Sequence, residues 1–389
     1  MLIRTFYKRK DDSALCCCEY INEDGERSHI LAAFCNCEAA DEAFDRLIKL
    51  NPVDERTTKK LWSTVSDRFR IPWPGGARRV PFDIFGAVLL VPCIMLLACI
   101  SWAMAFISYI IIFPAVIFSI HRLFRKKASL QSASLYGSSE GKRVKKHART
   151  KFFLVWLLVS VFLLLVIYST QVIPYLKISP YENLVLVIFM WISCTSMYLV
   201  QATSCAGFEP RSTADEQLYG EIIESGAWRI CGECEKQVPR QASHCRTCDA
   251  CYLMRDHHCL WLDTCISCVN DRWFVIGLWF GLLSLMYGSH LSLTSVCHPK
   301  LYDLYFTMVM LPHHCPDAFV NFQSRLAISG TCYGILMGIL VAIALIQQLV
   351  CVVGGVRLRD YRHRRQLPGQ SSLWSLKYAF RNCLHFWWR

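Results

Sequence analysis

Long runs without a charged residue dominate the hydrophobic pattern of this chain. They are Ile84–His121, Phe152–Leu176, Leu184–Glu209 (charged only at its last residue), Trp273–Pro299 and Leu326–Val356. A helix needs about 20 apolar residues to cross a hydrocarbon core about 30 Å thick. The first run has 38 residues and would be about 57 Å long as one helix. We therefore expect two spans in it, with a turn near Trp102–Ser108, and six transmembrane helices in all.

Basic residues indicate which loops face the cytoplasm. Segment 122–151 holds ten Lys or Arg and one Glu, and segment 356–389 holds eight Lys or Arg and one Asp. Cytoplasmic loops carry an excess of Lys and Arg. The residues before the first run are basic as well, so both its flanks are expected in the cytoplasm, which requires an even number of crossings. Loops 173–183 and 296–325, with few basic residues, are then lumenal or extracellular.

These patterns predict an α-helical integral membrane protein with a cysteine-rich cytosolic domain. The expected parts are a cytosolic region at 1–80, two transmembrane helices at 84–121, a basic cytosolic loop at 122–151, two helices at 152–202, the cysteine-rich domain at 203–272, a helix at 273–295, a lumenal loop at 296–325, a helix at 326–353 and a basic cytosolic tail at 354–389.

The composition agrees with a membrane protein. Of 389 residues, 54% are hydrophobic and only 19% are charged, and the net charge is +12. This balance excludes a disordered chain and is too apolar for an ordinary soluble enzyme. Because the basic runs adjoin apolar runs, we expect them to meet anionic membrane lipids, and we expect no nucleic-acid partner.

Two smaller cysteine groups each have alternative interpretations. Asp24-Gly25 predicts a hairpin between Cys16–Tyr20 and His29–Phe34, whose cysteines would bind a metal, carry acyl groups or simply pack. Cys297 and Cys315 share the expected lumenal loop. There they would form a disulfide or stay as free thiols.

The densest group of potential ligands lies between residues 231 and 268. It contains eight cysteines and three histidines, including two Cys-x-x-Cys pairs. Structural zinc takes four nitrogen or sulfur ligands, so two zinc ions would use eight of these eleven groups. About three groups would be left for chemistry. The alternative is a LIM-like or RING-like binding module in which all of them serve the metal sites.

The contiguous sequence Asp256-His257-His258-Cys259 suggests catalysis. A thiol nucleophile needs a base to take its proton and a further group to orient that base. A cysteine, a histidine and an aspartate supply these three roles. Counting alone does not decide which histidine binds zinc and which one acts as the base.

From Cys231 to Cys265, and on to Asn270 and Phe274, the spacing resembles the cysteine-rich domain of the DHHC protein S-acyltransferases, or palmitoyltransferases. The span arrangement resembles a six-span branch of that family without ankyrin repeats. Two N-terminal stretches, Cys16–Ile21 and Ser66–Trp73, resemble one vertebrate member.

The resemblance implies a role for each residue. Cys259 would accept the fatty acyl group, His257 would be its general base, and Asp256 would orient His257. Two structural zinc ions are implied, one on Cys231, Cys234, His244 and Cys251, and the other on Cys245, Cys248, His258 and Cys265.

The implied reaction moves a palmitoyl group from palmitoyl-CoA to cytosolic cysteines of membrane-proximal proteins, through an acyl-Cys259 intermediate. The active site would face the cytosol from the Golgi, the endoplasmic reticulum or the plasma membrane. Starting near Phe274, the small residues Gly277, Gly281 and Ser284 fall on one helix face. They would form a groove for the acyl chain or allow close helix packing.

Several positions depart from the family pattern. Leu260 stands where Pro is usual, Ser267 where Gly is usual, and Asp263-Thr264 replaces a common Asn-Asn pair. A carboxylate at Asp263 would disfavour the thiolate form of Cys259. These departures support an alternative function, a catalytically impaired, membrane-anchored zinc-finger adaptor.

Overall fold

A computed structural model describes most of the chain. The described residues are 15–22, 27–31, 38–49, 51, 54, 57, 67–122, 149–174, 180–204, 220, 228–304, 307–316, 318–358 and 376–388. They fall into two compact units, Met1–Ala87 and Val88–Arg389, which we describe separately.

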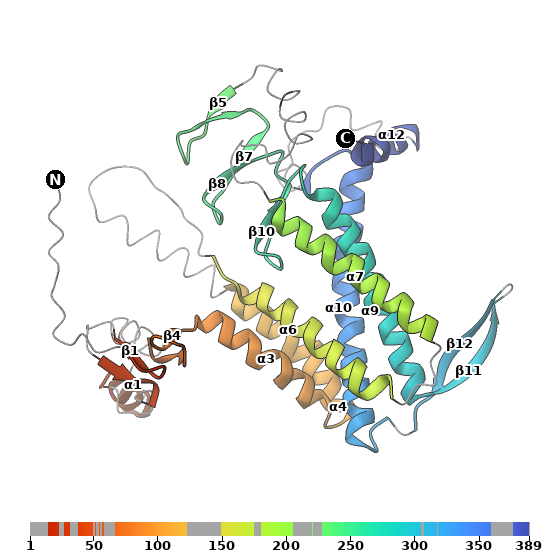
Figure 1. Ribbon diagram of the computed structural model, residues 1–389, viewed down its shortest axis with the longest axis horizontal. Coiled ribbons are helices and arrows are strands. Elements are labelled where there is room, and N and C mark those ends of the chain that lie inside the picture. Colours follow the sequence, from red (N-terminus) through yellow and green to blue (C-terminus); the bar gives the residue numbers. More distant parts are fainter. Residues whose placement is uncertain are drawn as a thin grey trace. The chain divides into compact units, whose positions relative to one another are not determined.

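Within the described residues, five helices are long and apolar enough to cross a membrane. They are Trp102–Arg122, Phe152–Val172, α7 (Pro180–Ala202), α9 (Asp271–Val296) and α10 (Phe322–Val353). The first of these contains α4 (Trp102–Phe106) and the π-helix η2 (Ile107–Ile112), and the second contains α6 (Phe152–Ile167) and the π-helix η4 (Tyr168–Val172). The expectation of a helical multi-pass membrane protein is confirmed (Figure 1).

The sixth expected span corresponds to α3 (Phe82–Ala98), a shorter apolar helix of 17 residues that contains Pro92. The turn predicted at Trp102–Ser108 was wrong, because the helix break comes earlier, at 99–101. Ser101 has extended backbone angles, and its side chain accepts a hydrogen bond from the N–H of Met104. A capping hydroxyl of this kind begins a new helix, and hydropathy does not mark it.

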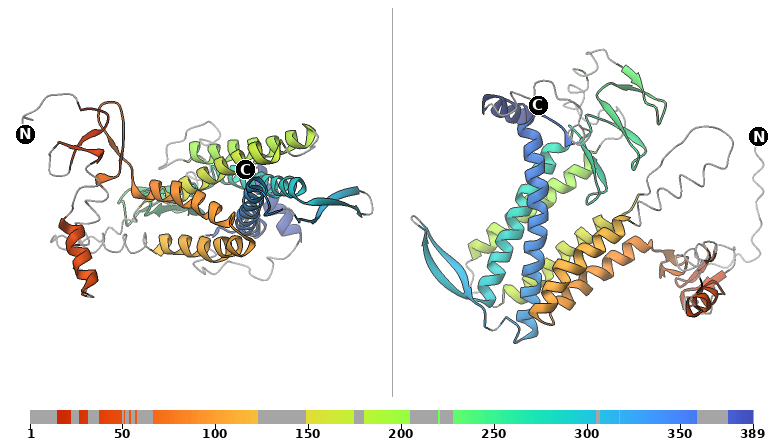
Figure 2. Two further views of the ribbon diagram at one scale, coloured as in Figure 1. Left: turned by 90° about the horizontal axis from the view of Figure 1, so that it is seen from below. Right: turned by 180° about the vertical axis from the view of Figure 1, so that it is seen from behind.

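Helix α9 packs between α7 and α10 (Figures 1 and 2). A side chain on Gly277 would come within 2.8 Å of Met197 on α7, and one on Gly281 within 3.1 Å of the Ser193 hydroxyl. Ser193 also donates a hydrogen bond to the carbonyl of Gly277 at 2.9 Å. The two glycines therefore let the α7 and α9 backbones approach each other.

Buried hydrogen bonds connect the earlier helices to α10. The hydroxyl of Tyr109 on η2 donates to the carbonyl of Ser329 at 2.9 Å, and the Ser329 hydroxyl donates to the carbonyl of Met95 on α3 at 2.7 Å. One helical turn further on, the indole N–H of Trp156 on α6 donates to the Tyr333 hydroxyl at 2.9 Å. Such bonds attach α3, η2 and α6 to α10 within an apolar bundle.

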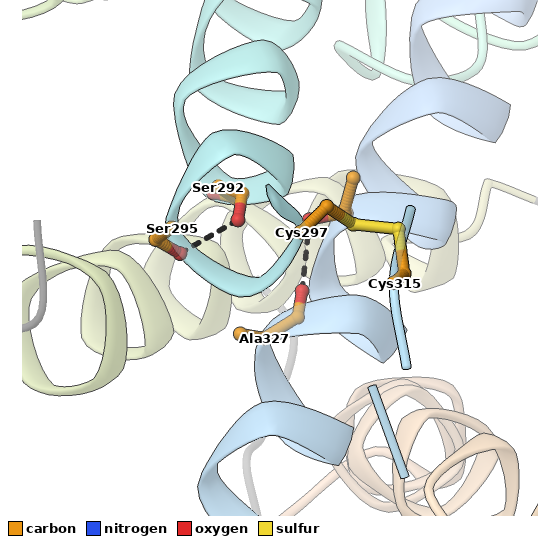
Figure 3. The surroundings of a disulfide bond; sticks show 6 residues. Ser292, Ser295, Cys297, Cys315 and Ala327 are labelled. Carbon is orange, nitrogen blue, oxygen red and sulfur yellow. Dashed lines mark hydrogen bonds between the residues drawn. A yellow bond between two sulfur atoms is a disulfide. The ribbon is translucent and has the colours of Figure 1, made fainter. Parts of the chain in front are cut away.

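At the far end of α9, strand β11 (His298–Leu304) pairs antiparallel with β12 (Thr307–His314). A disulfide joins Cys297 to Cys315 and encloses this hairpin (Figure 3). The disulfide interpretation of these two cysteines is confirmed.

In the N-terminal unit, β1 (Glu19–Ile21) pairs with β2 (Arg27–His29), and β3 (Arg70–Ile71) pairs with β4 (Arg78–Arg79). Helix α1 (Glu38–Ile48) belongs to the same unit. A hairpin forms here as predicted, but its strands overlap the expected stretches Cys16–Tyr20 and His29–Phe34 only in part, and its turn at Asp24-Gly25 lies outside the described residues.

Replacing Tyr333 with Phe tests the buried hydrogen bonds. Tyr333→Phe removes the acceptor of the Trp156 N–H, and we expect a loss of about 1 kcal/mol in unfolding free energy. Thermal unfolding of purified protein in detergent measures this change. Tyr198→Phe is the matched control, because Tyr198 is 69% exposed on α7, and it should leave the midpoint unchanged. Equal effects of both variants would contradict the assignment.

Candidate catalytic and metal sites

Residues 228–266 fold into three two-stranded hairpins. They pair β5 (Trp228–Ile230) with β6 (Gln237–Pro239), β7 (Ala242–Cys245) with β8 (Ala250–Leu253), and β9 (His257–Cys259) with β10 (Thr264–Ile266). Hydrogen bonds hold the third hairpin to the end of α7. Gln201 donates to the carbonyl of Leu262 at 3.0 Å, and Asn270 donates to the carbonyl of Val200 at 3.0 Å.

The hairpins bring the eight expected ligands together in two groups of four. In each group the ligand atoms all lie within 4.8 Å of one another. The Sγ atoms of Cys234 and Cys251 are 3.6 Å apart, and those of Cys248 and Cys265 are 3.7 Å apart. Two sulfurs on a tetrahedral zinc, each at about 2.3 Å, would be about 3.8 Å apart. The groups are Cys231, Cys234, His244 and Cys251, and Cys245, Cys248, His258 and Cys265. Both could hold zinc.

Strand pairing explains why the ligands of the two metal groups alternate along the chain. His244 lies opposite Cys251 across β7–β8, and His258 lies opposite Cys265 across β9–β10. Successive side chains on a strand point to opposite faces. Cys245 therefore joins the second group although its neighbour His244 belongs to the first.

The same alternation separates the two adjacent histidines. The side chain of His258 turns to the metal ligands, whereas His257 and Cys259, one residue to either side, occupy the other face of β9. Distances agree, because the Nδ1 atom of His258 lies 3.4 Å from the Cys248 sulfur. The third hairpin thus combines a metal-binding face and a face with a thiol and an imidazole.

On the second face, Asp256, His257 and Cys259 form a connected group. The Nδ1 atom of His257 lies 2.9 Å from a carboxylate oxygen of Asp256, and the imidazole also interacts with the Cys259 side chain. The other oxygen of Asp256 accepts from the backbone N–H of Leu358 at 2.6 Å, and Gln348 on α10 bonds to the same carboxylate. Asp256 is therefore fixed on both sides and orients the imidazole.

Electrostatics favour a charged pair at Asp256 and His257. Burial lowers the pKa of His257, but its hydrogen bonds to Asp256 and Cys259 outweigh burial and raise the pKa to about 9. Burial raises the pKa of Asp256, but the hydrogen bonds from His257 and Leu358 keep it below the usual range. An imidazole this basic retains a proton that it receives from a nearby thiol, and Asp256 stabilises the charge that it then carries.

Cys259 faces an apolar cluster at the end of the bundle, with 9% of its surface exposed. The cluster includes Val200 from α7, Phe274 from α9, Leu345 from α10 and Phe386 from the C-terminal helix α12 (Leu376–Trp388). The ring of Phe274 also lies edge-on to His257, with 5.5 Å between centroids. The thiol is thus surrounded by side chains that would accept an aliphatic chain.

The residues expected to line an acyl groove differ in their positions. Phe274 belongs to the apolar cluster around Cys259. Gly277 and Gly281 lie against α7, and the Ser284 hydroxyl donates to the carbonyl of Phe280 in its own helix. The glycines support the packing interpretation, and Phe274 alone touches the site.

Sequence reasoning missed the partner of Asp263. The Arg149 guanidinium bonds to both Asp263 carboxylate oxygens at 2.8 and 2.9 Å, and to the Asp263 carbonyl at 3.0 Å. The Asp263 side chain is only 5% exposed and lies 3.9 Å from Nε2 of His258. Since 114 residues separate the partners, no local pattern indicates the pair. The carboxylate that would oppose the Cys259 thiolate has a cationic partner.

Cys268, which has no place in either ligand group, is buried, with its sulfur 3.7 Å from the carbonyl of Leu253. It packs beside the first metal group without joining it.

Comparisons with known proteins agree with this site. Residues 224–363 match the family described as DHHC palmitoyltransferase. The chain is 27% identical to Palmitoyltransferase ZDHHC23-B of Danio rerio over 406 residues, covering 94% of this chain and 88% of the relative. It is 25% identical to Palmitoyltransferase ZDHHC23 of Homo sapiens over 407 residues, covering 93% of each.

A shorter match, 30% identical over 164 residues, links the chain to Palmitoyltransferase ERF2 of Eremothecium gossypii, covering 37% of this chain and 45% of the relative. Together with the two Cys/His groups, these matches support a DHHC-type protein S-palmitoyltransferase that resembles ZDHHC23.

Proposed function

We propose that this protein moves a palmitoyl group from palmitoyl-CoA to cytosolic cysteines of membrane-associated proteins through an acyl-Cys259 intermediate. The observation that carries the proposal is the hydrogen-bonded sequence of Asp256, His257 and Cys259 beside an apolar cluster. A thiol at the end of the membrane helices meets a thioester where its acyl tail leaves the bilayer and its coenzyme A reaches water.

The first step acylates the enzyme. His257 takes the proton of Cys259, and the thiolate attacks the thioester carbonyl. The bond from the carbonyl carbon to the coenzyme A sulfur breaks, and His257 returns the proton to the leaving thiolate. Asp256 stabilises the imidazolium that forms in between.

The second step repeats this exchange with a substrate thiol. Its proton goes to His257, its sulfur attacks the acyl-Cys259 carbonyl, and Cys259 leaves as the thiol. Each step exchanges one thioester for another, so neither is steeply downhill. Catalysis then depends mainly on proximity and thiol activation.

Zinc would have a structural role here. Four nitrogen and sulfur ligands leave no open coordination position, and such sites contribute folding energy. Cys265 and His258 would fix β9 to β10 and so hold Cys259 in place. The reaction itself would rest on the chain's own residues.

The orientation and location follow from charge and redox chemistry. Segments 122–151 and 356–389 are strongly basic, which supports a cytosolic site. The Cys297–Cys315 disulfide lies beyond the opposite end of α9, and disulfides persist in oxidising compartments. We propose that the protein resides in the Golgi, the endoplasmic reticulum or the plasma membrane with this end lumenal or extracellular.

The Arg149–Asp263 pair bears on the alternative of an impaired adaptor. That function drew its support from Asp263, whose unpaired charge would disfavour the Cys259 thiolate. With Arg149 in contact, the pair carries no net charge and can brace the turn between β9 and β10. We therefore favour the enzyme over the adaptor.

Replacing the nucleophile tests the intermediate. In Cys259→Ser, hydroxylamine-labile label from a palmitate analogue should disappear from residue 259, and transfer to a substrate protein should cease. Peptide mass mapping and a gel-based transfer assay measure the two effects. Cys194→Ser, at an exposed cysteine within α7, is the matched control and should transfer normally. Transfer that persists in Cys259→Ser would contradict the proposed mechanism.

The adjacent histidines test the division between the two faces of β9. His257→Ala should keep both zinc ions and slow transfer by about 10²-fold or more, the usual contribution of a general base. His258→Ala should lose one of the two zinc ions. Plasma mass spectrometry of purified protein counts the metal, and a reversed pattern would contradict the assignment.

The burial of the Asp263 carboxylate predicts a difference between two arginines. Arg149→Gln leaves the buried Asp263 carboxylate without its cation and should destabilise the protein by about 2 kcal/mol. Arg246→Gln, which removes a more exposed pair with Glu233, should cost less than about 1 kcal/mol. Thermal unfolding measures both.

A second substitution serves as the check on Arg149. Asp263→Asn in the Arg149→Gln background should restore much of the lost stability and transfer, since it removes the buried charge. Equal losses in the two arginine variants, without rescue, would contradict this role.

A further inference from the structure

Three consecutive cysteines, Cys16–Cys18, precede β1 in the N-terminal unit and take no part in the proposed reaction. Cys16 and Cys17 are exposed, and Cys18 is half-buried. The other exposed free cysteines among the described residues, Cys93 and Cys194, lie within apolar helices. Cys16 and Cys17 are therefore the exposed free cysteines that the described part of the chain has outside those helices.

The backbone of these cysteines is fixed. The N–H of Trp73 donates to the carbonyl of Cys17 at 3.0 Å, and the N–H of Ile30 donates to the carbonyl of Cys18 at 2.9 Å. The Cys16 N–H donates to the Glu19 carboxylate at 2.9 Å. A turn held in this way presents its thiols at a defined place.

That place is the entry to the apolar helix α3. Strand β4 ends at Arg79, three residues before α3 begins at Phe82. The ring of Phe69 packs on Phe82 and Phe85, with centroids 5.5 and 4.8 Å apart. Because Trp73 lies between β3 and β4 and bonds to Cys17, the cysteine turn is attached to the beginning of α3. In the proposed topology α3 enters the bilayer, so these thiols lie at its surface.

The side chains around the turn are those found at a membrane interface. The guanidinium of Arg78 lies over the ring of Trp73 at 4.9 Å. Ile71 and Trp73 are 48% and 44% exposed. Aromatic and basic residues are enriched at the lipid headgroups, which suits a surface that touches the membrane.

The described residues offer no metal-binding group that includes the three cysteines. Two groups of residues with metal-ligand geometry occur in the part of the chain that the structure describes, and neither includes Cys16–Cys18. The Cys17 and Cys18 sulfurs lie 3.6 Å apart, and the Cys17 side chain also interacts with that of Cys16. Of the three interpretations open from the sequence, the acylated surface agrees best with exposure and position.

We propose that Cys16 and Cys17 are S-acylated, with the thioester at Cys259 of this enzyme as the acyl donor. The acceptor sulfur attacks the carbonyl of acyl-Cys259, a new carbon–sulfur bond forms, and the bond to Cys259 breaks. The acceptor's proton passes through His257 to the Cys259 sulfur. One thioester replaces another, so no oxidant is needed. The donor assignment rests on the proposed function.

Catalysis by the enzyme is needed for such a transfer. Hydrogen bonds from Cys18 and Cys16 raise the pKa of the Cys17 thiol, so little thiolate is present at neutral pH to react with acyl-CoA unaided. Each acyl chain would strengthen membrane contact in proportion to the number of methylenes that it buries. Two chains beside the first helix would hold the N-terminal unit against the bilayer.

The test uses the full chain in cells fed a palmitate analogue, with label mapped by peptide mass. Wild type should carry hydroxylamine-labile label on Cys16 or Cys17 and on Cys259. In cells without an active copy of this enzyme, Cys259→Ser should carry at least tenfold less label on Cys16 and Cys17 than wild type. Cys16→Ser/Cys17→Ser should keep the Cys259 label and transfer to other proteins at the wild-type rate.

Two outcomes would overturn the inference in different ways. A wild-type chain labelled on Cys259 but not on Cys16 or Cys17 would refute the N-terminal site and leave the proposed function standing. N-terminal label that is equal in wild type and Cys259→Ser would refute the donor. If the wild-type chain also lacks label on Cys259, the proposed acyl-enzyme intermediate is refuted as well.

Discussion

The alternation of side chains along β9 is the constraint on which the whole site depends. Three consecutive residues with metal-binding or nucleophilic side chains would compete for one ion if they shared a face. The strand turns His258 toward Cys248 and Cys265 and leaves His257 and Cys259 on the other side. A two-residue period thus lets a metal-binding hairpin also present a reactive thiol, without a further loop or domain.

Contacts from distant segments brace this hairpin on two sides. Asp256 is held by Leu358 and by Gln348 from α10, and Asp263 is held by Arg149, just before α6. The membrane helices and the site therefore form one structure. A displacement of Gln348 or Leu358 would shift the His257 imidazole through the Asp256 carboxylate that they hold. The arrangement exists only when α6, α7 and α10 are assembled.

Much of this could be predicted from the sequence, for identifiable physical reasons. Hydropathy revealed the spans because a bilayer excludes charge over a fixed thickness. Ligand spacing indicated two zinc sites, and the resemblance to the DHHC family supplied the ligands of each. The helix break at Ser101 involves one capping hydroxyl, which hydropathy does not reveal, so its predicted position was wrong. Gly277 and Gly281 suit a groove or a packed interface equally well by spacing. Arg149 is a long-range partner, which a local pattern cannot reveal.

The enclosed hairpin β11–β12 has a consequence for biosynthesis. Its two cysteines must be oxidised, whereas the six ligand cysteines at the other end of α9 must stay reduced to bind metal. No single compartment meets both demands. A chain inserted upside down would fail at both ends at once, with its metal sites cross-linked and its hairpin open. In the proposed topology, the two compartments would each accept only one end of the molecule, so the topology would be checked chemically during maturation.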